Sequence, residues 1–315
     1  WGAATLSAAY TVANDGASGS WLAFCGNPFW RTPADAQAAR TEGRATQLLN
    51  ALGTRGTAAL EDVDGQFAIA WWDARSSTLH LIRDRFGAEP LHYGVDHGRI
   101  VFGSRAEHVA RALPTKPKVS PQGLAEYLTY CYLPGNTTLF DGVLRVPPGS
   151  VVSASGERAP VVTSWYRLSY ADPWEPDEQA ITRQYRELLE ESVVARLDDS
   201  RLGVFLSGGM DSSSVLTFAR RHRTRDIDTF SFRCAGAGFD ESMFARELAS
   251  ELHSNHAEVE YGEAEALTIL DAVEAMDSPF CDIGIEIGTH LSRLQHAQLF
   301  QERERFGMSA FQVVE

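Results

Sequence analysis

Cysteine is scarce in this sequence, and its spacing excludes two common roles. The four cysteines are Cys25, Cys131, Cys234 and Cys281, and no two of them form a C-x-x-C pair. Cysteines this far apart indicate neither a zinc site nor a disulfide framework. Few cysteines in an acidic chain of this size are typical of the reducing cytosol, so a cytoplasmic location is expected.

Basic residues are also in short supply, and long apolar runs are missing. The 315 residues include 28 Lys and Arg against 42 Asp and Glu, which gives a net charge of −14. This charge argues against nonspecific binding of nucleic acid or of an anionic membrane surface. No apolar run reaches the length of a transmembrane helix, and no signal peptide is visible. The basic run 220–225 is expected to be a solvated helix end.

The first half of the chain is dominated by short strand patterns. Residues 1–112 contain strand candidates at 21–24, 66–72, 78–82 and 99–102, and a single helical pattern at 34–52. Residues 113–175 are rich in Pro and Gly and are expected to connect two domains. A short apolar helix is predicted inside this connector, at 124–132.

A different pattern begins at residue 176, where helices and strands alternate. Alternation of this kind predicts a parallel, doubly wound sheet over 176–315. In such a sheet the ligand binds at the carboxyl ends of the strands. The expected elements are helix 178–196, strand 202–206, helix 213–222, strand 229–232, helix 240–252 and strand 256–260.

The loop after strand 202–206 carries the strongest chemical signal in the chain. It reads Ser207-Gly208-Gly209-Met210-Asp211-Ser212. The two glycines let backbone N–H groups turn inward, while the serine hydroxyls and the N-terminus of the next helix add donors for an anion. The loop differs from a Walker loop and from a dinucleotide fingerprint. The alternative interpretation is a glycine-rich turn with a serine N-cap.

The same loop resembles the pyrophosphate loop of the ATP pyrophosphatases, with the pattern S-G-G-x-D-S. The resemblance implies ATP as the ligand. An acidic residue beside phosphates requires a bridging divalent cation, so Asp211 is the predicted Mg²⁺ ligand. The predicted ATP-binding residues are Leu206, Ser207, Gly208, Gly209, Asp211, Ser212 and Phe232.

Further motifs, in the same order along the chain, resemble those of the asparagine synthetase family. They are 64–68 (D-G-Q-F-A), 83–93 (R-D-R-F-G-A-E-P-L-H-Y), 138–140 with 146–149, 240–241 and 277–280. The resemblance implies an α/β chain with an N-terminal αββα glutaminase-like (Ntn-type) sandwich at 1–112. A connector at 113–175 and an ATP pyrophosphatase domain at 176–315 would follow.

Two motifs of the family's synthetase domain are not found after His290-Leu291. They are an acidic S-G-x-G-x-D-E loop, which completes the metal site, and a basic catalytic residue. We expect the segments that hold them to belong near position 291 and after position 315, so no catalytic residue is assigned. Asp282 is a candidate for the substrate cleft, although a structural role for the segment Phe280-Cys281-Asp282 is equally compatible with the sequence.

The N-terminal half departs from a working glutaminase of this family. The N-G-E-I-Y-N motif, which supplies the oxyanion hole, is replaced by 25–30 (C-G-N-P-F-W). The acidic G-S-D-x-E motif aligns with 42–46, so that Arg44 and Ala45 stand where a carboxylate holds the amine of glutamine. No G-x-D-x-E occurs in the first 60 residues. The resemblance therefore implies that glutamine is not the nitrogen source.

Family members with an inactive glutaminase domain use an amine that is already on the substrate. The short N-terminal domain is most similar to that of the lasso peptide cyclases. This similarity implies ATP-dependent macrolactam formation in a precursor peptide, with release of AMP and pyrophosphate. The implied partners are a leader-peptide protease and a leader-recognition protein. The alternatives are a glutamine-dependent asparagine synthetase, a β-lactam synthetase-like cyclase and a non-enzymatic scaffold.

Overall fold

The computed structural model describes residues 10–156, 158–170, 177–197, 201–234, 242–261 and 311–314. The described residues up to Tyr170 form one compact unit, and those from Asp177 onward form a second. Each unit has its own hydrophobic core. Among the described residues, no helix combines the length and the apolarity that crossing a membrane requires.

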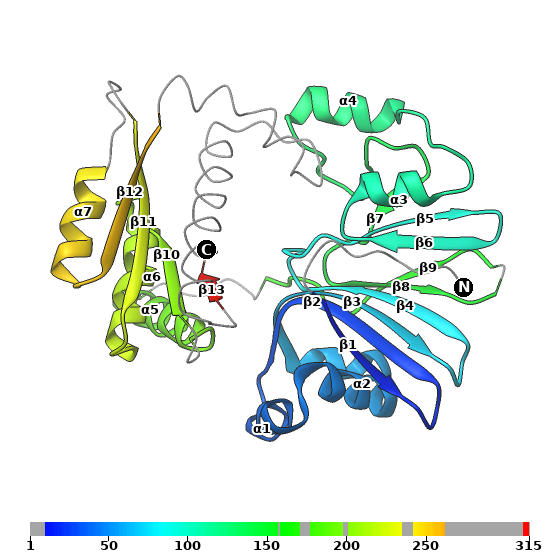
Figure 1. Ribbon diagram of the computed structural model, residues 1–315, viewed down its shortest axis with the longest axis horizontal. Coiled ribbons are helices and arrows are strands. Elements are labelled where there is room, and N and C mark those ends of the chain that lie inside the picture. Colours follow the sequence, from blue (N-terminus) through cyan, green and yellow to red (C-terminus); the bar gives the residue numbers. More distant parts are fainter. Residues whose placement is uncertain are drawn as a thin grey trace, which may run out of the picture. The chain divides into compact units, whose positions relative to one another are not determined.

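Unit 1 contains two antiparallel sheets (Figure 1). The larger has the order β1-β2-β3-β4-β8-β9 and the smaller the order β6-β5-β7. The strands of the larger sheet are β1 (Thr11–Asp15), β2 (Ser20–Trp30), β3 (Val63–Asp73), β4 (Thr78–Arg83), β8 (Ser150–Ala154) and β9 (Val161–Ser164). Those of the smaller sheet are β5 (His92–Asp96), β6 (Arg99–Gly103) and β7 (Val143–Arg145).

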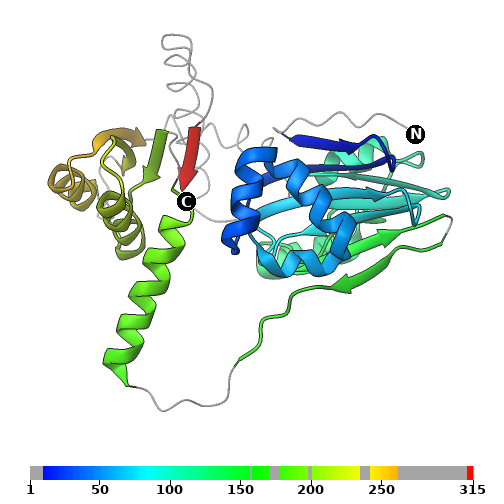
Figure 2. The same ribbon diagram turned by 90° about the horizontal axis from the view of Figure 1, so that it is seen from below.

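Side chains of β3 alternate between two cores, and this alternation creates the layers of unit 1. Phe67, Ile69 and Trp71 enter the core under the helices α1 (Pro33–Glu42) and α2 (Arg44–Arg55). Ala68 and Ala70 enter the core between the two sheets. The helix α3 (Ala106–Ala112) packs on the outer face of the smaller sheet. Figure 2 shows α1 and α2 on their side of the larger sheet, which completes the predicted αββα sandwich.

The region expected to connect two domains contributes strands to unit 1. β7 pairs with β5 of the smaller sheet, and β8 and β9 extend the larger sheet beyond β4. Some of its Pro and Gly residues, such as those at 147–149, form the turns that join these strands, which gives the segment the composition of a linker. The apolar helix predicted at 124–132 is present as α4 (Pro121–Tyr130).

The single helix predicted at 34–52 is two helices, with a break at Gly43. Gly43 has φ of 91°, a left-handed value that favours glycine and that ends α1 before α2 begins. A short 3₁₀ helix, η1 (Gly56–Asp62), then leads from α2 into β3. The apolar spacing continues across the break, because both helices cover the same core.

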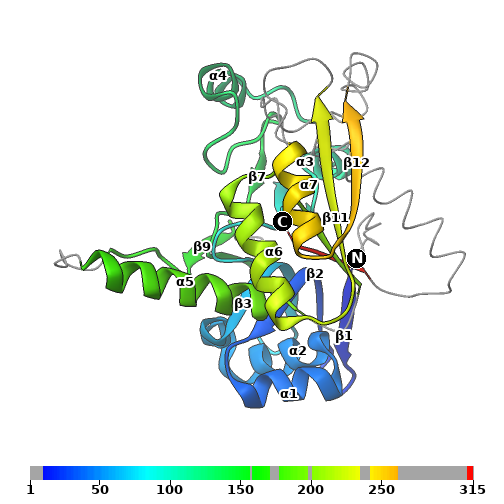
Figure 3. The ribbon, with the colours of Figure 1, turned by 90° about the vertical axis from the view of Figure 1, so that its left-hand side faces the viewer.

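Unit 2 is built on a parallel sheet with the order β12-β11-β10-β13. Its strands are β10 (Arg201–Phe205), β11 (Ile227–Cys234), β12 (Asn255–Tyr261) and β13 (Phe311–Val314). The helices α5 (Glu178–Val194), α6 (Met210–His222) and α7 (Ser242–Glu251) share one core with Leu202, Val204 and Leu206. Figure 3 shows the three helices on one side of the sheet. The predicted alternation of helices and parallel strands is confirmed over the described residues.

Candidate functional site

The glycine-rich loop lies at the carboxyl end of β10, between that strand and α6. Leu206 is buried, and its backbone N–H donates to the carbonyl of Phe230 on β11 at 2.8 Å, so the loop starts from a fixed point. Gly208 has φ of 86°, which reverses the chain. Gly209 is the N-cap of α6, whose first-turn N–H groups therefore open toward the loop.

The hydroxyls of Ser207 and Ser212 hydrogen-bond within this loop and hold its backbone N–H groups close together. The Ser212 hydroxyl accepts a hydrogen bond from the backbone N–H of Ser207 at 3.2 Å, and the two hydroxyls lie 3.0 Å apart. The Ser207 hydroxyl accepts in turn from the N–H of Gly209 at 3.2 Å. These backbone amides and hydroxyls converge at the positive end of α6, which is the arrangement that binds phosphate oxygens.

The structure brings six of the seven predicted ATP-binding residues into this one loop. Leu206, Ser207, Gly208 and Gly209 precede α6, and Asp211 and Ser212 belong to its first turn. The seventh, Phe232, lies on β11, the strand beside β10. The side chain of Phe232, Asp282 and the segments 240–241 and 277–280 lie outside the described residues.

Asp211 is the one predicted metal ligand, and its setting fits a cation that bridges phosphates. It is exposed in the first turn of α6, beside the donors that would hold the phosphates. Within the described part of the chain, no three Asp, Glu, His or Cys side chains are grouped so that they could hold a metal ion by themselves. A cation bound here would complete its coordination with phosphate and water oxygens, as Mg²⁺ commonly does.

In unit 1, residues 25–30, which replace the expected oxyanion-hole motif, belong to β2 and pack tightly against β3. Gly26 on β2 and Gly65 on β3 have φ of 92° and 94°. A Cβ on Gly26 would lie 2.3 Å from the Gln66 carbonyl oxygen, and one on Gly65 would lie 2.3 Å from that of Asn27. Only glycine fits at either position, so the two strands approach each other closely here.

The thiol nearest to this strand pair is poorly suited to act as a nucleophile. Cys25 Sγ lies 3.8 Å from the carbonyl oxygen of Ala68 and 3.9 Å from Glu89 Oε2. Burial, and then the charge of Glu89, raise the pKa of the Cys25 thiol to about 11. Because the thiolate is the reactive form, Cys25 is not activated.

The position that the sequence predicts to align with the glutamine-binding carboxylate is occupied by Arg44, a cation. Arg44 begins α2, and its guanidinium donates a hydrogen bond to the Asn27 side-chain oxygen on β2. The adjacent Ala45 is buried in the core beneath α2. A guanidinium repels an ammonium group, and no carboxylate at these two positions offsets it.

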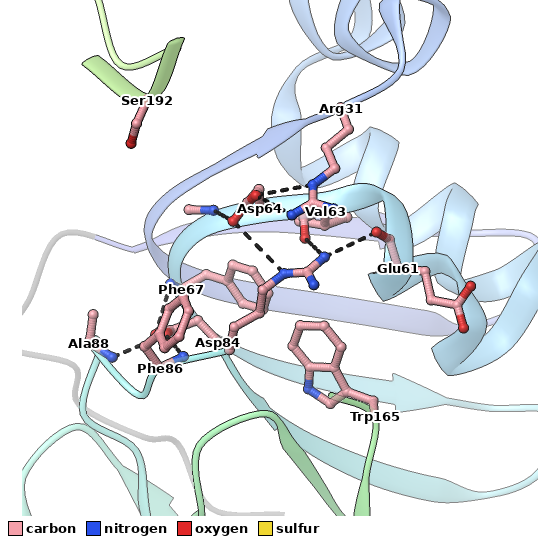
Figure 4. Close-up of polar contacts among 12 residues, drawn as sticks. Arg31, Glu61, Val63, Asp64, Phe67, Asp84, Phe86, Ala88, Trp165 and Ser192 are labelled. Atoms are coloured by element: carbon pink, nitrogen blue, oxygen red, sulfur yellow. Dashed lines mark hydrogen bonds and ion pairs between the residues drawn. The ribbon is translucent and has the colours of Figure 1, made fainter. Parts of the chain in front are cut away.

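The R-D-R-F-G motif of unit 1 has a structural role, because its side chains hold strands and turns together. The sequence alone did not predict this role. Asp84 is 1% exposed, and its carboxylate accepts hydrogen bonds from four backbone N–H groups, of which Figure 4 includes those of Phe67, Phe86 and Ala88. One oxygen accepts from Phe86 at 3.1 Å and Ala88 at 3.0 Å, and the other from Glu89 at 2.9 Å and Phe67 at 3.3 Å. Phe67 belongs to the D-G-Q-F-A motif, so Asp84 joins the two motifs.

The two arginines of this motif are also structural. Arg83 donates to the carbonyl oxygens of Glu89 at 2.7 Å and Val146 at 2.9 Å. Arg85 lies over the rings of Trp165 and Tyr166, and its Nε lies 3.8 Å from Asp64 Oδ1.

Asp64 is held by a second arginine as well. Arg31 Nη2 donates to Asp64 Oδ2 at 2.8 Å (Figure 4). Burial, the largest single influence, opposes ionisation of Asp64, but the hydrogen bonds from Arg31 and the Gly65 N–H together with the charges of Arg31 and Arg85 outweigh it and lower the pKa of this carboxyl. The interactions of these motif residues therefore join strands and turns of unit 1.

Comparison with protein families matches each unit to a different domain model. Residues 31–166 match the glutamine amidotransferase domain, and residues 184–298 match asparagine synthase. The first match covers most of the described part of unit 1. The second includes the glycine-rich loop and α6.

Individual relatives agree with these two matches. Asparagine synthetase [glutamine-hydrolyzing] 1 of Bacillus subtilis is 27% identical over 189 residues, which cover 60% of this chain and 29% of that protein. Asparagine synthetase [glutamine-hydrolyzing] 2 of the same organism is 29% identical over 226 residues, covering 66% and 29%. Amidase chyE of Penicillium rubens is 29% identical over 263 residues, covering 77% and 38%. The chain thus spans about a third of the length of these relatives.

The order of the motifs, the two domain matches and the relatives agree with the αββα sandwich and the phosphate-type loop seen in the structure. The chain belongs to the asparagine synthetase family.

Proposed function

We propose that the protein forms an amide bond by activating a carboxylate with ATP, with release of pyrophosphate and AMP. The observation that carries the proposal is the loop 207–212, where backbone amides, two serine hydroxyls and the N-terminus of α6 converge. A carboxylate oxygen is a poor leaving group, whereas the AMP of an acyl-adenylate is a good one.

Each residue of the loop would have a separate role in this reaction. In this structure the amides of Ser207 and Gly209 and the hydroxyl of Ser212 donate to Ser212 Oγ, Ser207 Oγ and the Gly209 carbonyl. With ATP bound, these donors would exchange those bonds for the β- and γ-phosphates as negative charge develops on the departing pyrophosphate. Asp211 would hold Mg²⁺, which neutralises phosphate charge when it is bound. Buried Leu206 fixes the start of the loop to β11 and so would keep the phosphate-binding donors in a constant position relative to the sheet.

We further propose that the attacking amine arrives with the substrate. Arg44 and the unactivated Cys25 give unit 1 no means of binding or hydrolysing glutamine at the aligned positions. A peptide with a free α-amine and an Asp or Glu side chain would carry both reacting groups. Holding them together turns ring closure into a positioned intramolecular step, which can lower the barrier by several kcal/mol, about 7–11 at best. A leader-peptide protease and a leader-recognition protein would supply such a precursor peptide.

Incubation of the purified protein with glutamine should produce no glutamate above background, with or without ATP. The reason is the cation at position 44, which repels the amine of glutamine, together with a Cys25 thiol that stays protonated. An enzyme-coupled glutamate assay measures this directly, with a glutamine-hydrolysing relative as the positive control. Sustained glutamate formation would remove the argument for an amine on the substrate and would favour a glutamine-dependent asparagine synthetase.

With a linear precursor peptide freed of its leader, the product should weigh one water less than the substrate. One AMP and one pyrophosphate should form for each ring closed, because each adenylate is consumed by one amine. Mass spectrometry and a pyrophosphate assay measure the two quantities, and the same peptide with an acetylated α-amine is the matched control. Asparagine formed from aspartate and ammonia, without a peptide product, would contradict the macrolactam proposal. A β-lactam formed from a small β-amino acid would instead favour the β-lactam synthetases.

A further inference from the structure

A groove that begins at Met210 of the glycine-rich loop lies between α5 and α6 of unit 2. It has a volume of about 340 Å³, and one residue of α5 and six of α6 line it. Met210, which is 83% exposed, supplies most of the accessible apolar surface, and Phe218, which is 7% exposed, adds only an edge. Arg186 of α5 and Arg221 of α6 supply positive charge. The remaining lining residues are Ser213, Ser214 and Thr217.

The hydroxyl face of this groove suits a close-packed helix better than a small anion. The Ser214 and Thr217 hydroxyls donate to the carbonyl oxygens of Met210 and Ser213 within α6, so two of the three hydroxyl donors of the groove are already used. The groove therefore presents the short side chains of Ser213, Ser214 and Thr217 beside the apolar surface of Met210. Small residues let a second helix approach closely, and exposed Met and Arg are enriched at protein interfaces.

The charge of the groove selects an acidic partner. Arg221 lies over the Phe218 ring at 5.3 Å and reaches Glu190 only at 3.8 Å, while Glu190 accepts a shorter contact from His222 at 2.8 Å. No described carboxylate pairs with Arg186. In a chain of net charge −14, a groove with two exposed guanidiniums is an unusual site for attracting carboxylates.

Helix α7 carries the complementary chemistry on its solvent side. Met243 and Phe244 are 60% and 54% exposed. Glu247 and Glu251, one turn apart, are exposed beside them, and no described cation pairs with either. The buried side of the helix is formed by Ala245 and Ala249. The outer side of α7 is therefore an acidic, apolar surface of the kind that the groove fits.

We propose that the groove between α5 and α6 receives α7 of a second copy of this chain. The helices α5, α6 and α7 lie on the same side of the sheet, with α6 between α5 and α7 (Figure 3). A two-fold axis near α6 would therefore seat each α7 in the groove of the other copy, and the contact would be made twice. Glu247 and Glu251 would face Arg186 and Arg221, while Met243 and Phe244 would cover Met210 and the edge of Phe218.

The experiment is a charge exchange followed by analytical ultracentrifugation of the full chain. The unsubstituted protein should sediment as a reversible dimer whose fraction rises with concentration. Arg186→Glu with Arg221→Glu should raise the dimer dissociation constant by about tenfold or more, because like charges then face each other. Glu247→Arg with Glu251→Arg should do the same. The variant that carries all four substitutions should recover dimerisation.

The matched control is Arg158→Glu with Arg167→Glu, which changes the net charge equally at exposed positions of unit 1. This variant should dimerise as the unsubstituted chain does, and circular dichroism should show that every variant is folded. A protein that sediments as a monomer at all concentrations would overturn the proposal, as would a fourfold variant that stays monomeric. Because sedimentation does not depend on ATP, the outcome is independent of the proposed amide-forming activity.

Discussion

Replacement of Asp211 by Asn should abolish ATP consumption while unit 2 remains folded. Asn keeps the shape of the side chain but removes the negative charge that would hold Mg²⁺ beside the phosphates. Pyrophosphate release with substrate present should fall by at least about a hundredfold, the scale expected when a group that stabilises developing charge is lost. Asp211 is exposed in the first turn of α6, so its replacement removes no packing.

The matched control for this variant is Asp226→Asn. Asp226 is exposed on the turn before β11, in the same unit but away from the glycine-rich loop, and this change removes the same charge. Release of pyrophosphate by the control should equal that of the unsubstituted protein, and both variants should melt at the same temperature. An Asp211→Asn protein that still released pyrophosphate at the unsubstituted rate would show that the loop has been assigned wrongly.

Replacement of Asp84 by Ala should destabilise unit 1 by about 3–5 kcal/mol, the usual cost of breaking a buried charged network from one side. Four backbone N–H groups would lose their acceptor in a site that is almost fully buried. For a unit of this size the melting temperature should fall by roughly 10 °C, as followed by calorimetry. Asn should not rescue the fold, because each carboxylate oxygen accepts from two N–H groups and an amide NH₂ would face two of them.

Asp141→Ala provides the comparison for this loss. Asp141 is exposed on the turn before β7, and its change should alter the free energy of unfolding by no more than about 0.5 kcal/mol. The two variants lose the same charge and the same atoms, so their difference measures burial and hydrogen bonding alone. Equal melting temperatures for Asp84→Ala and Asp141→Ala would refute the structural role of the R-D-R-F-G motif.

The parallel unit could be predicted well from local patterns, because its elements are continuous in sequence. Apolar spacing identified α5 and α6, and the apolar run before Ser207 identified β10. The glycine-rich loop was predictable for the same reason, since its donors come from neighbouring residues.

Features that depend on distant segments were not predictable in this way. The break at Gly43 leaves the apolar spacing of α1 and α2 intact, so periodicity alone predicts one helix. The close approach of Gly26 to Gly65 requires the register of β2 on β3. The strands β7 to β9 have the composition of a linker, and only their pairing partners show that they belong to unit 1.

The buried carboxylate of Asp84 has a structural role that does not depend on catalysis. Its partners are main-chain amides of β3 and of the turn after β4. Asp84 therefore stabilises the folded unit whether or not glutamine is cleaved. Arg44 and Cys25 could therefore change without disturbing the motifs by which a glutamine amidotransferase domain is recognised. These motifs therefore identify the fold of unit 1, whereas the proposed reaction depends on other side chains, such as those of the loop 207–212.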